Sequence, residues 1–472
     1  MTSRRALLAC GFIVAGCAAE RPAPPPVATP AAWTPRTVVS EVDASSSREE
    51  LRAWWHSFGD ATLDELIDAA LLANLDVASA RARVEQARAL GRAAFGERLP
   101  SLGVGLQATH ATTSRNDALG KVSSAIGAPR NFNDFSMAFD AAWDLDVSGR
   151  LAARERAADA NTAASEEELR DRQRQLIAIT ALTYIELRRT QSDRALLAEI
   201  AASWEESARL AAARARGGVD HAVESARARS EAHALRAQVA VEDEAIEIAI
   251  HRLSILAGDA PTVWQPRLAS EAALPSAAHA TVPLDAPVAI LARRPDVRRS
   301  EALWRAADAR HAEAQAARWP SLTLGALLGV ASTSTGNLFS TDSRFTSAGA
   351  SLFAPLFEGG RLRAEAQAAD AGRSAEAKAL EATVLHALEE VESAIAAFEQ
   401  RARERTARES ELEERATARR LTASRTAAGI ATRLPDLEAQ RALADARRAL
   451  LEAQAQQSEA LVRAFTAIGA GP

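Results

Sequence analysis

The chain contains two copies of one pattern, and each copy includes a very long run without proline. In each copy a helix-forming stretch leads to two short alternating segments, then to Gly-Arg, and then to the long run. Gly149 and Gly360 precede the two runs, Gly218 and Gly429 follow them, and 211 positions separate the members of each pair. Equal spacing of two independent landmarks indicates a duplication, so the folding unit is a repeat of strands plus a helical hairpin.

Each long run is rich in Ala, Glu, Arg and Leu and covers about 68 residues, so as a helix it would extend about 100 Å, deeper than any globular core. In the second run apolar residues recur at intervals of four and three, a heptad seam that favours packing along the whole length. The seam comprises Val384, Leu388, Val391, Ile395, Phe398 and Ala402, and the first copy has Ile177, Tyr184 and Leu187 at the positions equivalent to 388, 395 and 398. A plain antiparallel coiled coil without a pore is the alternative. Two helical hairpins on one chain, each continuing from a strand pair, favour an arrangement in which the hairpins lie side by side and form the wall of a tube.

The segments before the long runs alternate between apolar and polar residues with a period of two. Between residues 135 and 146 the apolar face is made by Phe135, Met137, Phe139, Ala141, Trp143 and Leu145. Residues 102–108 and 322–330 alternate in the same way, and seven of the 12 phenylalanines lie in or beside these segments. An apolar outer face is typical of transmembrane barrel strands, so we predict β-hairpins at residues 101–146 and 321–357. Alternation alone leaves open two soluble hairpins packed on a core.

Two hairpins supply four strands, and this number has a consequence for assembly. Four strands cannot close into a barrel, whereas a bilayer tolerates no open sheet edge. If the hairpins span a membrane, the chain must therefore oligomerise. The turn-rich segments 112–133 and 332–344 are then predicted to be external loops.

The N-terminus has the features of a lipoprotein signal. Arg4 and Arg5 precede an apolar run at residues 6–15, which is too short to span a bilayer, and Val-Ala-Gly then leads to Cys17. This pattern resembles a bacterial lipobox, in which the cysteine is acylated and begins the mature chain; an ordinary signal peptide is the alternative. Ala18 and Ala19 lack the aspartate that resembles an inner-membrane retention signal, which favours the outer membrane. Six prolines between residues 22 and 35 predict an extended, unpacked tether.

Composition and motifs narrow the functional classes. The only cysteines are Cys10, inside the signal, and Cys17, so neither a disulfide nor a cysteine metal site is expected in the mature chain. The net charge of −6 makes nucleic-acid binding a poor expectation. No His-Glu-x-x-His, Gly-x-Ser-x-Gly or phosphate-binding glycine motif occurs, and His221 is more typical of a surface histidine than of a ligand. We therefore expect that the chain is not an enzyme and that it binds no cofactor.

Several blocks spread along the chain resemble the TolC family of outer membrane factors, in its NodT/OprM-like lipoprotein branch that serves resistance-nodulation-division pumps. The blocks that carry the resemblance are Trp-Trp-His-Ser-Phe-Gly-Asp at 54–60, Leu-Ala-Arg-Arg-Pro-Asp-Val at 291–297, Trp-Pro-Ser-Leu at 319–322, Pro-Leu-Phe at 355–357 before Gly-Gly-Arg, Ala-Leu-Glu-Glu-Val-Glu at 387–392 and Asp-Leu-Glu-Ala-Gln-Arg at 436–441. They cover nearly the whole mature chain. The resemblance implies a mainly α fold with transmembrane β: a homotrimer with a 12-stranded β-barrel in the outer membrane, continuous with a periplasmic α-helical barrel.

The same resemblance implies passive conduction from an inner-membrane pump and a periplasmic membrane-fusion adaptor to the outside. Substrate would enter at the periplasmic tips, where Gly217, Gly218 and Gly429 turn the two hairpins. The family closes this tip with polar links and carboxylates, which makes Glu438 the first candidate for a constriction, followed by Asp220 and Glu224. For each of them a solvated charge at a helix end is the alternative. Pro435, near the second tip, is expected in the first turn of the last long helix.

We therefore expect the following organisation: a signal peptide at 1–16, a tether at 17–50 that begins with lipidated Cys17, a first repeat at 51–258, a linker and equatorial segment at 259–294, and a second repeat at 295–468. The expected function is that of an outer membrane duct for small-molecule efflux. A type I secretion duct for polypeptides and a non-conducting coiled-coil spacer between envelope layers are the alternatives. The spacer would need the long helices but not the alternating strands.

Overall fold

The computed structural model describes residues 26–35, 39–40, 51–116, 118–127, 129–219, 221–277 and 280–471. Its main helices are α2 (Ala61–Ala73), α3 (Leu75–Gly96), α5 (Arg150–Arg216), α6 (Ala222–Leu256), α8 (Pro287–Arg293), α9 (Pro295–Ala316), α10 (Arg361–Ala427) and α11 (Arg433–Ala467). Its main strands are β2 (Ser101–Thr112), β3 (Asn131–Asp144), β5 (Ser321–Ser332) and β6 (Arg344–Phe353). Short elements complete it: β1 (Val39–Ser40), η1 (Trp54–Phe58), α4 (Ala118–Ala125), α7 (Gln265–Leu268), β4 (Val282–Pro283), η2 (Thr335–Asn337) and η3 (Thr341–Ser343).

The duplication is visible in matched helix lengths. α5 and α10 each have 67 residues, α6 and α11 each have 35, and α3 and α9 each have 22. Gly149 and Gly360 cap the starts of α5 and α10, and Gly218 and Gly429 follow their ends; all four have positive φ. Glycine adopts this backbone region more readily than any other residue, which explains why it recurs at the same four places.

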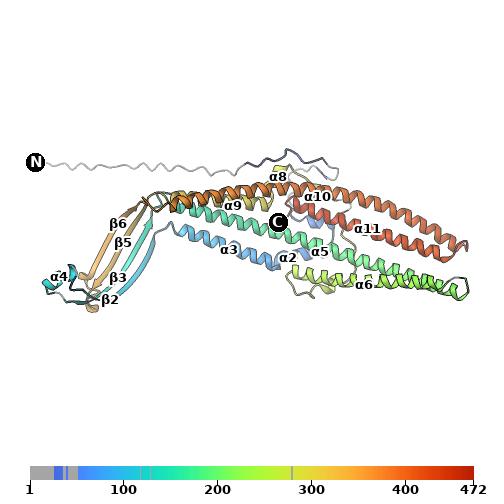
Figure 1. Cartoon of the computed structure of the whole chain (residues 1–472), viewed down its shortest axis with the longest axis horizontal. Helices are drawn as coiled ribbons and strands as arrows, with labels where there is room; N and C mark the ends of the chain where they lie inside the picture. The colour runs from blue at the N-terminus through green and yellow to red at the C-terminus, as the bar shows by residue number, and fades with distance from the viewer. Residues whose placement is uncertain are drawn as a thin grey trace.

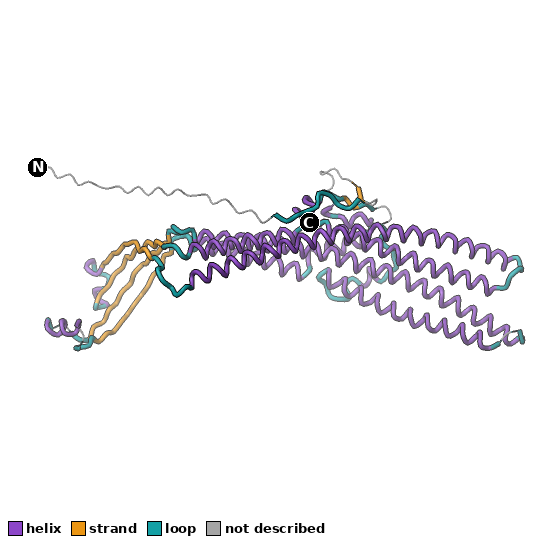
Figure 2. The backbone as a smooth tube through the Cα atoms, turned by 45° about the horizontal axis from the view of Figure 1, so that its top comes forward, coloured by secondary structure: helices purple, strands orange, loops and turns teal. Residues whose placement is uncertain are grey.

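Each very long helix is accompanied by two shorter ones that together follow its length. α5 packs against α3 over one part and against α6 over another, and α10 packs in the same way against α9 and α11. The two units are joined because α5 also contacts α9 and α11. The result is an elongated molecule with the strands at one end and both helical hairpin turns at the other (Figure 1 and Figure 2).

The two predicted hairpins join into one antiparallel sheet in the order β2-β3-β5-β6. Its ladder aligns Val104 with Phe139 and Phe139 with Leu328, and it aligns Leu106 with Met137. Residues that are directly opposite in a ladder share a face of the sheet, so the apolar faces of both hairpins lie on one side. The sequence predicted a turn-rich loop between β2 and β3. The structure shows that this loop also contains the eight-residue helix α4.

The largest apolar core lies where the shorter helices meet at mid-length. It combines η1, α2, the middle of α5 and α10, and the C-terminal parts of α6 and α11, with Trp54 stacked on Phe465 at 5.2 Å between ring centroids. Asp60 caps α2 through the amides of Thr62 and Leu63, and it also accepts a 2.8 Å hydrogen bond from the Tyr184 hydroxyl of α5. Burial, opposed by Arg188, raises the pKa of Tyr184 to about 12, so this hydroxyl remains a donor.

Two hydrogen-bonded contacts, which we call the helix-end clasps, hold the shorter helices in register at this level. In the first repeat Asn74 caps α3 with its side-chain oxygen, while its Nδ2 donates to the Leu256 carbonyl at the end of α6. In the second repeat Arg294, directly before α9, donates to the Ala467 carbonyl at the end of α11, at 2.5 Å. The last carbonyls of a helix have no partner within it, so these contacts satisfy groups that burial would otherwise penalise.

The second clasp is reinforced by charge. Arg293 donates to the Ile468 carbonyl and Arg174 of α5 donates to the Thr466 carbonyl, so three consecutive carbonyls at the end of α11 face arginines. The buried Arg294 guanidinium is also held by two carboxylates, Asp296 at 2.7 Å and Glu390 of α10 at 2.5 Å. Cations at a helix C-terminus are favoured by the helix dipole.

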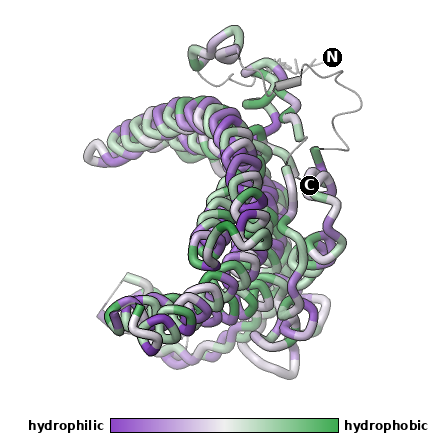
Figure 3. The backbone as a smooth tube through the Cα atoms, turned by 90° about the vertical axis from the view of Figure 1, so that its right-hand side faces the viewer, coloured by the Kyte–Doolittle hydropathy of each residue, from purple (hydrophilic) through white to green (hydrophobic). Residues whose placement is uncertain are grey.

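The helices form a curved layer, as a view along the long axis shows (Figure 3). Of the predicted seam, Val384, Val391, Ile395 and Phe398 are buried, whereas Leu388 and Ala402 are only partly covered. Beyond Glu399 no residue of α10 is fully buried within this chain. Among the described residues, no helix has both the length and the apolar character that crossing a membrane requires.

The expectation that the proline-rich tether is unpacked is wrong for its described part. Val27 packs against the apolar cluster of α8, α9 and α10, and Trp33 packs against the central core and donates a 2.7 Å hydrogen bond to the Asp285 carbonyl. Thr34 bonds Glu392 through both its amide and its hydroxyl, and β1 pairs with β4 in parallel. A proline-rich segment needs few partners for its own backbone, so its few apolar side chains decide where it docks.

The second clasp predicts a strong and local effect on stability. Replacing Arg294 by alanine removes the donor to Ala467 and leaves Asp296 without its buried partner, which should cost about 3–5 kcal/mol. We expect a clear drop in the thermal unfolding temperature of the detergent-solubilised protein. Arg299→Ala is the matched control on the same helix, because its 3.4 Å pair with Glu168 is partly exposed and worth under about 1 kcal/mol. Equal drops in both variants would refute the clasp.

The same contact predicts a dependence on pH. Burial disfavours the ionised form of Asp296, but the hydrogen bonds and charge of Arg294 outweigh it and lower the pKa of this carboxyl. Its contribution to stability is therefore present above the unfolded pKa of about 3.9 and is lost as pH falls through the lower folded value. The difference in unfolding temperature between the wild type and Asp296→Asn should be steady near neutral pH and shrink below about pH 4. A difference that persists unchanged in stronger acid would contradict this assignment.

Candidate functional site

The hairpin turns between the long helices lie at the end of the molecule opposite the sheet (Figure 2). α5 ends at Arg216 and α6 begins at Ala222, so Gly217 and Gly218 lie in the first turn. α10 ends at Ala427 and α11 begins at Arg433, which places Gly429 in the second turn. Pro435 is the third residue of α11, in its first turn as predicted, where its missing N–H leaves no intrahelical bond unmade.

Of the three candidate carboxylates, the two that the structure describes are not brought into contact within one chain. Glu438 lies exposed in the second turn of α11, and Glu224 lies exposed in the first turn of α6, 3.4 Å from Arg227. No hydrogen bond or ion pair links Glu224 with Glu438 in the part of the chain that the structure describes. Asp220 lies outside the described residues.

A buried acid close to the second tip escaped the sequence analysis as a candidate. Asp436 is almost fully buried in the first turn of α11; one of its carboxylate oxygens bonds Arg433, and the other has no hydrogen-bond partner among the described residues. Arg433 also reaches α5, where its Nε lies 3.1 Å from Glu206. Arg433 therefore joins the start of α11 to the other helical hairpin, formed by α5 and α6.

Two further arginines of α11 continue the contact with α5, and we call Arg433, Arg441 and Arg448 the arginine row. Arg448 makes a bidentate pair with the buried Asp193 at 2.6 and 2.9 Å. Arg441 donates to the Ser207 hydroxyl at 2.9 Å, and its guanidinium lies over the Trp204 ring at 3.9 Å from the centroid. Burial lowers the pKa of Arg441, although an arginine stays charged at any physiological pH.

The arginine row had one signal in the sequence, namely its spacing of seven to eight residues. Positions separated by seven or eight share a helix face, so the row could have been recognised as one stripe of α11. The partners of the row could not have been recognised from the sequence, because the contacts join residues that lie 227 to 255 positions apart. The row fixes the two helical hairpins side by side over the half of the molecule that leads to the tips.

The chain alone leaves surfaces that require further partners. None of the described strands pairs with the outer edge of β2 or of β6. At the junction between sheet and helices the side chains of Leu356 and Phe357 are 94% and 89% exposed. Unpaired sheet edges beside large exposed apolar side chains indicate an assembly interface rather than a free surface.

The family model described as outer membrane efflux protein matches residues 66–259 and 286–470, which together are most of the chain. The chain belongs to the outer membrane efflux protein family. It is similar over 98% of its length to the pyoverdine export outer membrane protein OpmQ of Pseudomonas putida, of which it covers 97% at 29% identity. It is also 29% identical to the toluene efflux pump outer membrane protein TtgI of Pseudomonas putida, over 88% of this chain and 86% of that protein.

Solved structures give the same assignment. The outer-membrane channel OprN superposes with a TM-score of 0.80 at 27% identity, covering 94% of this chain and 99% of that one. The outer membrane protein VceC of Vibrio cholerae shares the fold, with a TM-score of 0.77 at 24% identity over 89% of this chain and 98% of that one. The fold is thus that of the TolC-family channels, in which three chains complete a β-barrel continuous with a helical barrel.

The family assignment settles the main expectations from the sequence. This outer membrane efflux protein lies in the outer membrane and acts with an adaptor and an inner-membrane pump, and these are the partners that the sequence predicted. The named relatives support the prediction of an efflux duct over the two alternatives, a type I secretion duct and a coiled-coil spacer. The family is one of transport ducts and not of enzymes. The open edges of β2 and β6 and the curved helical layer are the features that a trimer completes.

The arginine row gives a prediction with two adjacent residues. Arg448→Ala leaves the buried Asp193 unpaired and should lower stability by about 3 kcal/mol or more. Arg447→Ala is the control on the next position, because Arg447 lies 3.5 Å from the exposed Glu199 and should contribute less than about 1 kcal/mol. Thermal unfolding and limited trypsin digestion of the tip half would measure the difference. If both variants behave like the wild type, Arg448 does not hold the hairpins together.

Proposed function

We propose that small organic molecules enter this efflux duct at its helical tips, pass a constriction lined by carboxylates, and leave through the β-barrel without chemical change. The single observation that best supports a conduit is the four-stranded sheet with two open edges at one end of helices about 100 Å long. Three such sheets are what a closed barrel of 12 strands requires.

The proposed entrance is formed by the turns at Gly217, Gly218 and Gly429. Glu438 is the first candidate for the constriction, and Asp220 and Glu224 are the others. What supports Glu438 is its exposure on α11, two residues from the buried Asp436 and within the stretch that the arginine row anchors to α5. A side chain that stays exposed directly after the buried Asp436 and Leu437 is available to a lumen, whereas Asp436 serves packing between helices.

The cargo class rests on the relatives. Two of them are named for pyoverdine export and toluene efflux, and pyoverdine and toluene are small molecules of unlike chemistry. We propose a broad small-molecule cargo for this chain, with selection made by the pump. Accumulation of a fluorescent dye in cells that lack their own outer membrane component, with and without this chain and its pump, would test it. Unchanged accumulation in cells that display a stable trimer would reject the efflux role.

We further propose that Cys17 is acylated and anchors the mature chain to the outer membrane; this residue lies outside the described part of the chain. The intact mass of the purified protein tests the proposal. It should equal residues 17–472 plus acyl chains, and Cys17→Ser should remove the acyl mass. A mature chain that begins at another residue would exclude the lipobox.

The constriction can be tested with one thiol, because an acylated Cys17 leaves the mature chain without a free cysteine. We expect that Glu438→Cys, reacted with a bulky cationic thiol reagent, lowers single-channel conductance in a planar bilayer several-fold, because the reagent narrows the pore and reverses the local charge. Glu271→Cys is the control, since Glu271 is exposed in the linker between α7 and β4. Full modification of Glu438→Cys without any change in conductance would remove Glu438 from the constriction.

A further inference from the structure

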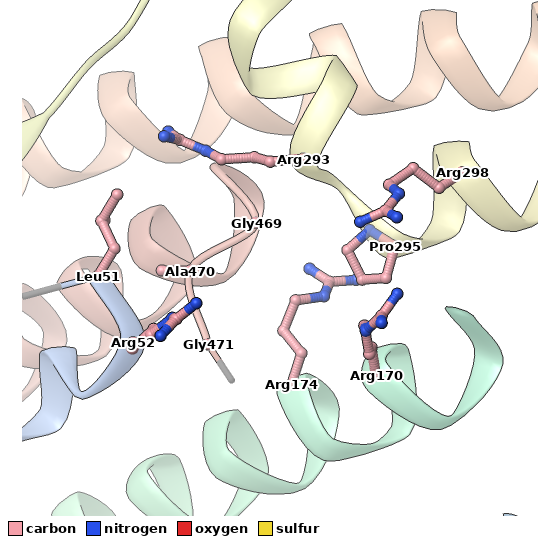
Figure 4. Close-up of a pocket in the computed structure, with 10 residues that line it drawn as sticks. All are labelled: Leu51, Arg52, Arg170, Arg174, Arg293, Pro295, Arg298, Gly469, Ala470 and Gly471. Atoms are coloured by element: carbon pink, nitrogen blue, oxygen red, sulfur yellow. The ribbon is translucent and has the colours of Figure 1, made fainter. Parts of the chain in front are cut away.

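A cavity of about 320 Å³ opens beside the second helix-end clasp, and every charged side chain that lines it is an arginine (Figure 4). It lies where the segment before η1, α5, the junction of α8 with α9, and the residues after α11 meet. The arginines are Arg52, Arg170, Arg174, Arg293 and Arg298. Arg293 directs its guanidinium to Asp285 and the Ile468 carbonyl, and Arg174 directs its guanidinium to Asp171 and the Thr466 carbonyl. Arg52, Arg170 and Arg298 therefore supply the donors that remain.

The carboxylates behind the cavity compensate only part of this charge. Glu167, which is buried, pairs with both Arg170 at 2.5 Å and Arg298 at 2.8 Å through the same oxygen. Asp171 pairs with Arg174. Two carboxylates therefore serve three guanidinium groups, and Arg52 adds a fourth that makes no hydrogen bond or ion pair with any described residue. Like charges gathered in one concave site raise its positive potential.

The donors that remain are arranged for an anion. Arg170 uses one nitrogen for Glu167 and Arg298 uses one, which leaves the rest of each guanidinium fork without an acceptor in the described part of the chain. Figure 4 shows Arg170, Arg174 and Arg298 extending toward one another beside Pro295, with Arg52 close to Gly471. Planar guanidinium forks match the paired oxygens of carboxylates and phosphates, and clusters of them are typical of sites that bind such groups.

We propose that this cavity, which we call the arginine cavity, binds a small multivalent anion bearing carboxylate or phosphate groups. The bound anion would link four segments that are distant in sequence, namely residues 51–52, α5, α9 and the residues after α11. It would act as a structural ligand at mid-length, whereas the proposed constriction lies at the tips. The proposal does not depend on the cargo or on the closing of the tip.

Calorimetric titration of the detergent-solubilised full chain would test the site, with pyrophosphate and citrate as probes below about 1 mM and at constant ionic strength in chloride. Low concentrations exclude the general stabilisation that such salts give at high concentration. We expect saturable binding of one anion per chain and a matching rise in unfolding temperature. Stronger binding of pyrophosphate would assign the site to phosphate groups, and stronger binding of citrate would assign it to carboxylates.

Arg52→Gln is the decisive variant, because Arg52 makes no hydrogen bond or ion pair with any described residue, so the substitution should leave the described contacts intact. It should bind the probe at least tenfold more weakly while its unfolding temperature without the probe stays unchanged. Arg229 is an exposed arginine of α6, far along the chain, and it likewise pairs with no described residue, so Arg229→Gln should bind like the wild type. Absence of saturable binding in the wild type, or equal affinity in Arg52→Gln, would overturn the proposal, and neither result would affect the efflux function.

Discussion

At mid-length, the ends of four helices meet, and their unpaired backbone groups must all be satisfied at one level of a long molecule. α3 begins where α6 ends, and α9 begins where α11 ends, while α5 and α10 continue past both breaks. A buried break in a helix leaves carbonyls and amides without partners, and the two clasps supply them. The shorter helices on both sides of this level take their register from it.

The two repeats solve this common problem with different chemistry. The first uses the neutral amide of Asn74, which can both accept from α3 and donate to α6. The second uses Arg294, which can only donate and therefore brings Asp296 and Glu390 to balance its charge. A buried charge is costly without partners, so the second clasp carries a larger network than the first. A duplicated backbone thus does not require duplicated side chains.

The sequence was sufficient where the structure follows from local periodicity. The strand pairs, the helix ends at glycine and the apolar side of the sheet all repeat with a period of two or with the spacing of the duplication. It was insufficient where contacts join distant positions: the pairing of Arg448 with Asp193 and the clasp of Arg294 leave no local trace in the chain. The docking of Trp33 was missed because proline content describes the backbone and not what a single indole contacts.

The docked N-terminal segment sets how far the membrane anchor can reach. Val27 is the first residue of the apolar contact, and ten positions separate it from Cys17, so the chain between them spans about 33–36 Å at most. α9 starts near the same contact and runs toward the sheet over 22 residues, or about 33 Å. If Cys17 is acylated as proposed, the membrane surface that holds it lies within about 36 Å of Val27, which is close to the length of α9. The docked segment would then limit the distance between the membrane and the middle of the helical layer.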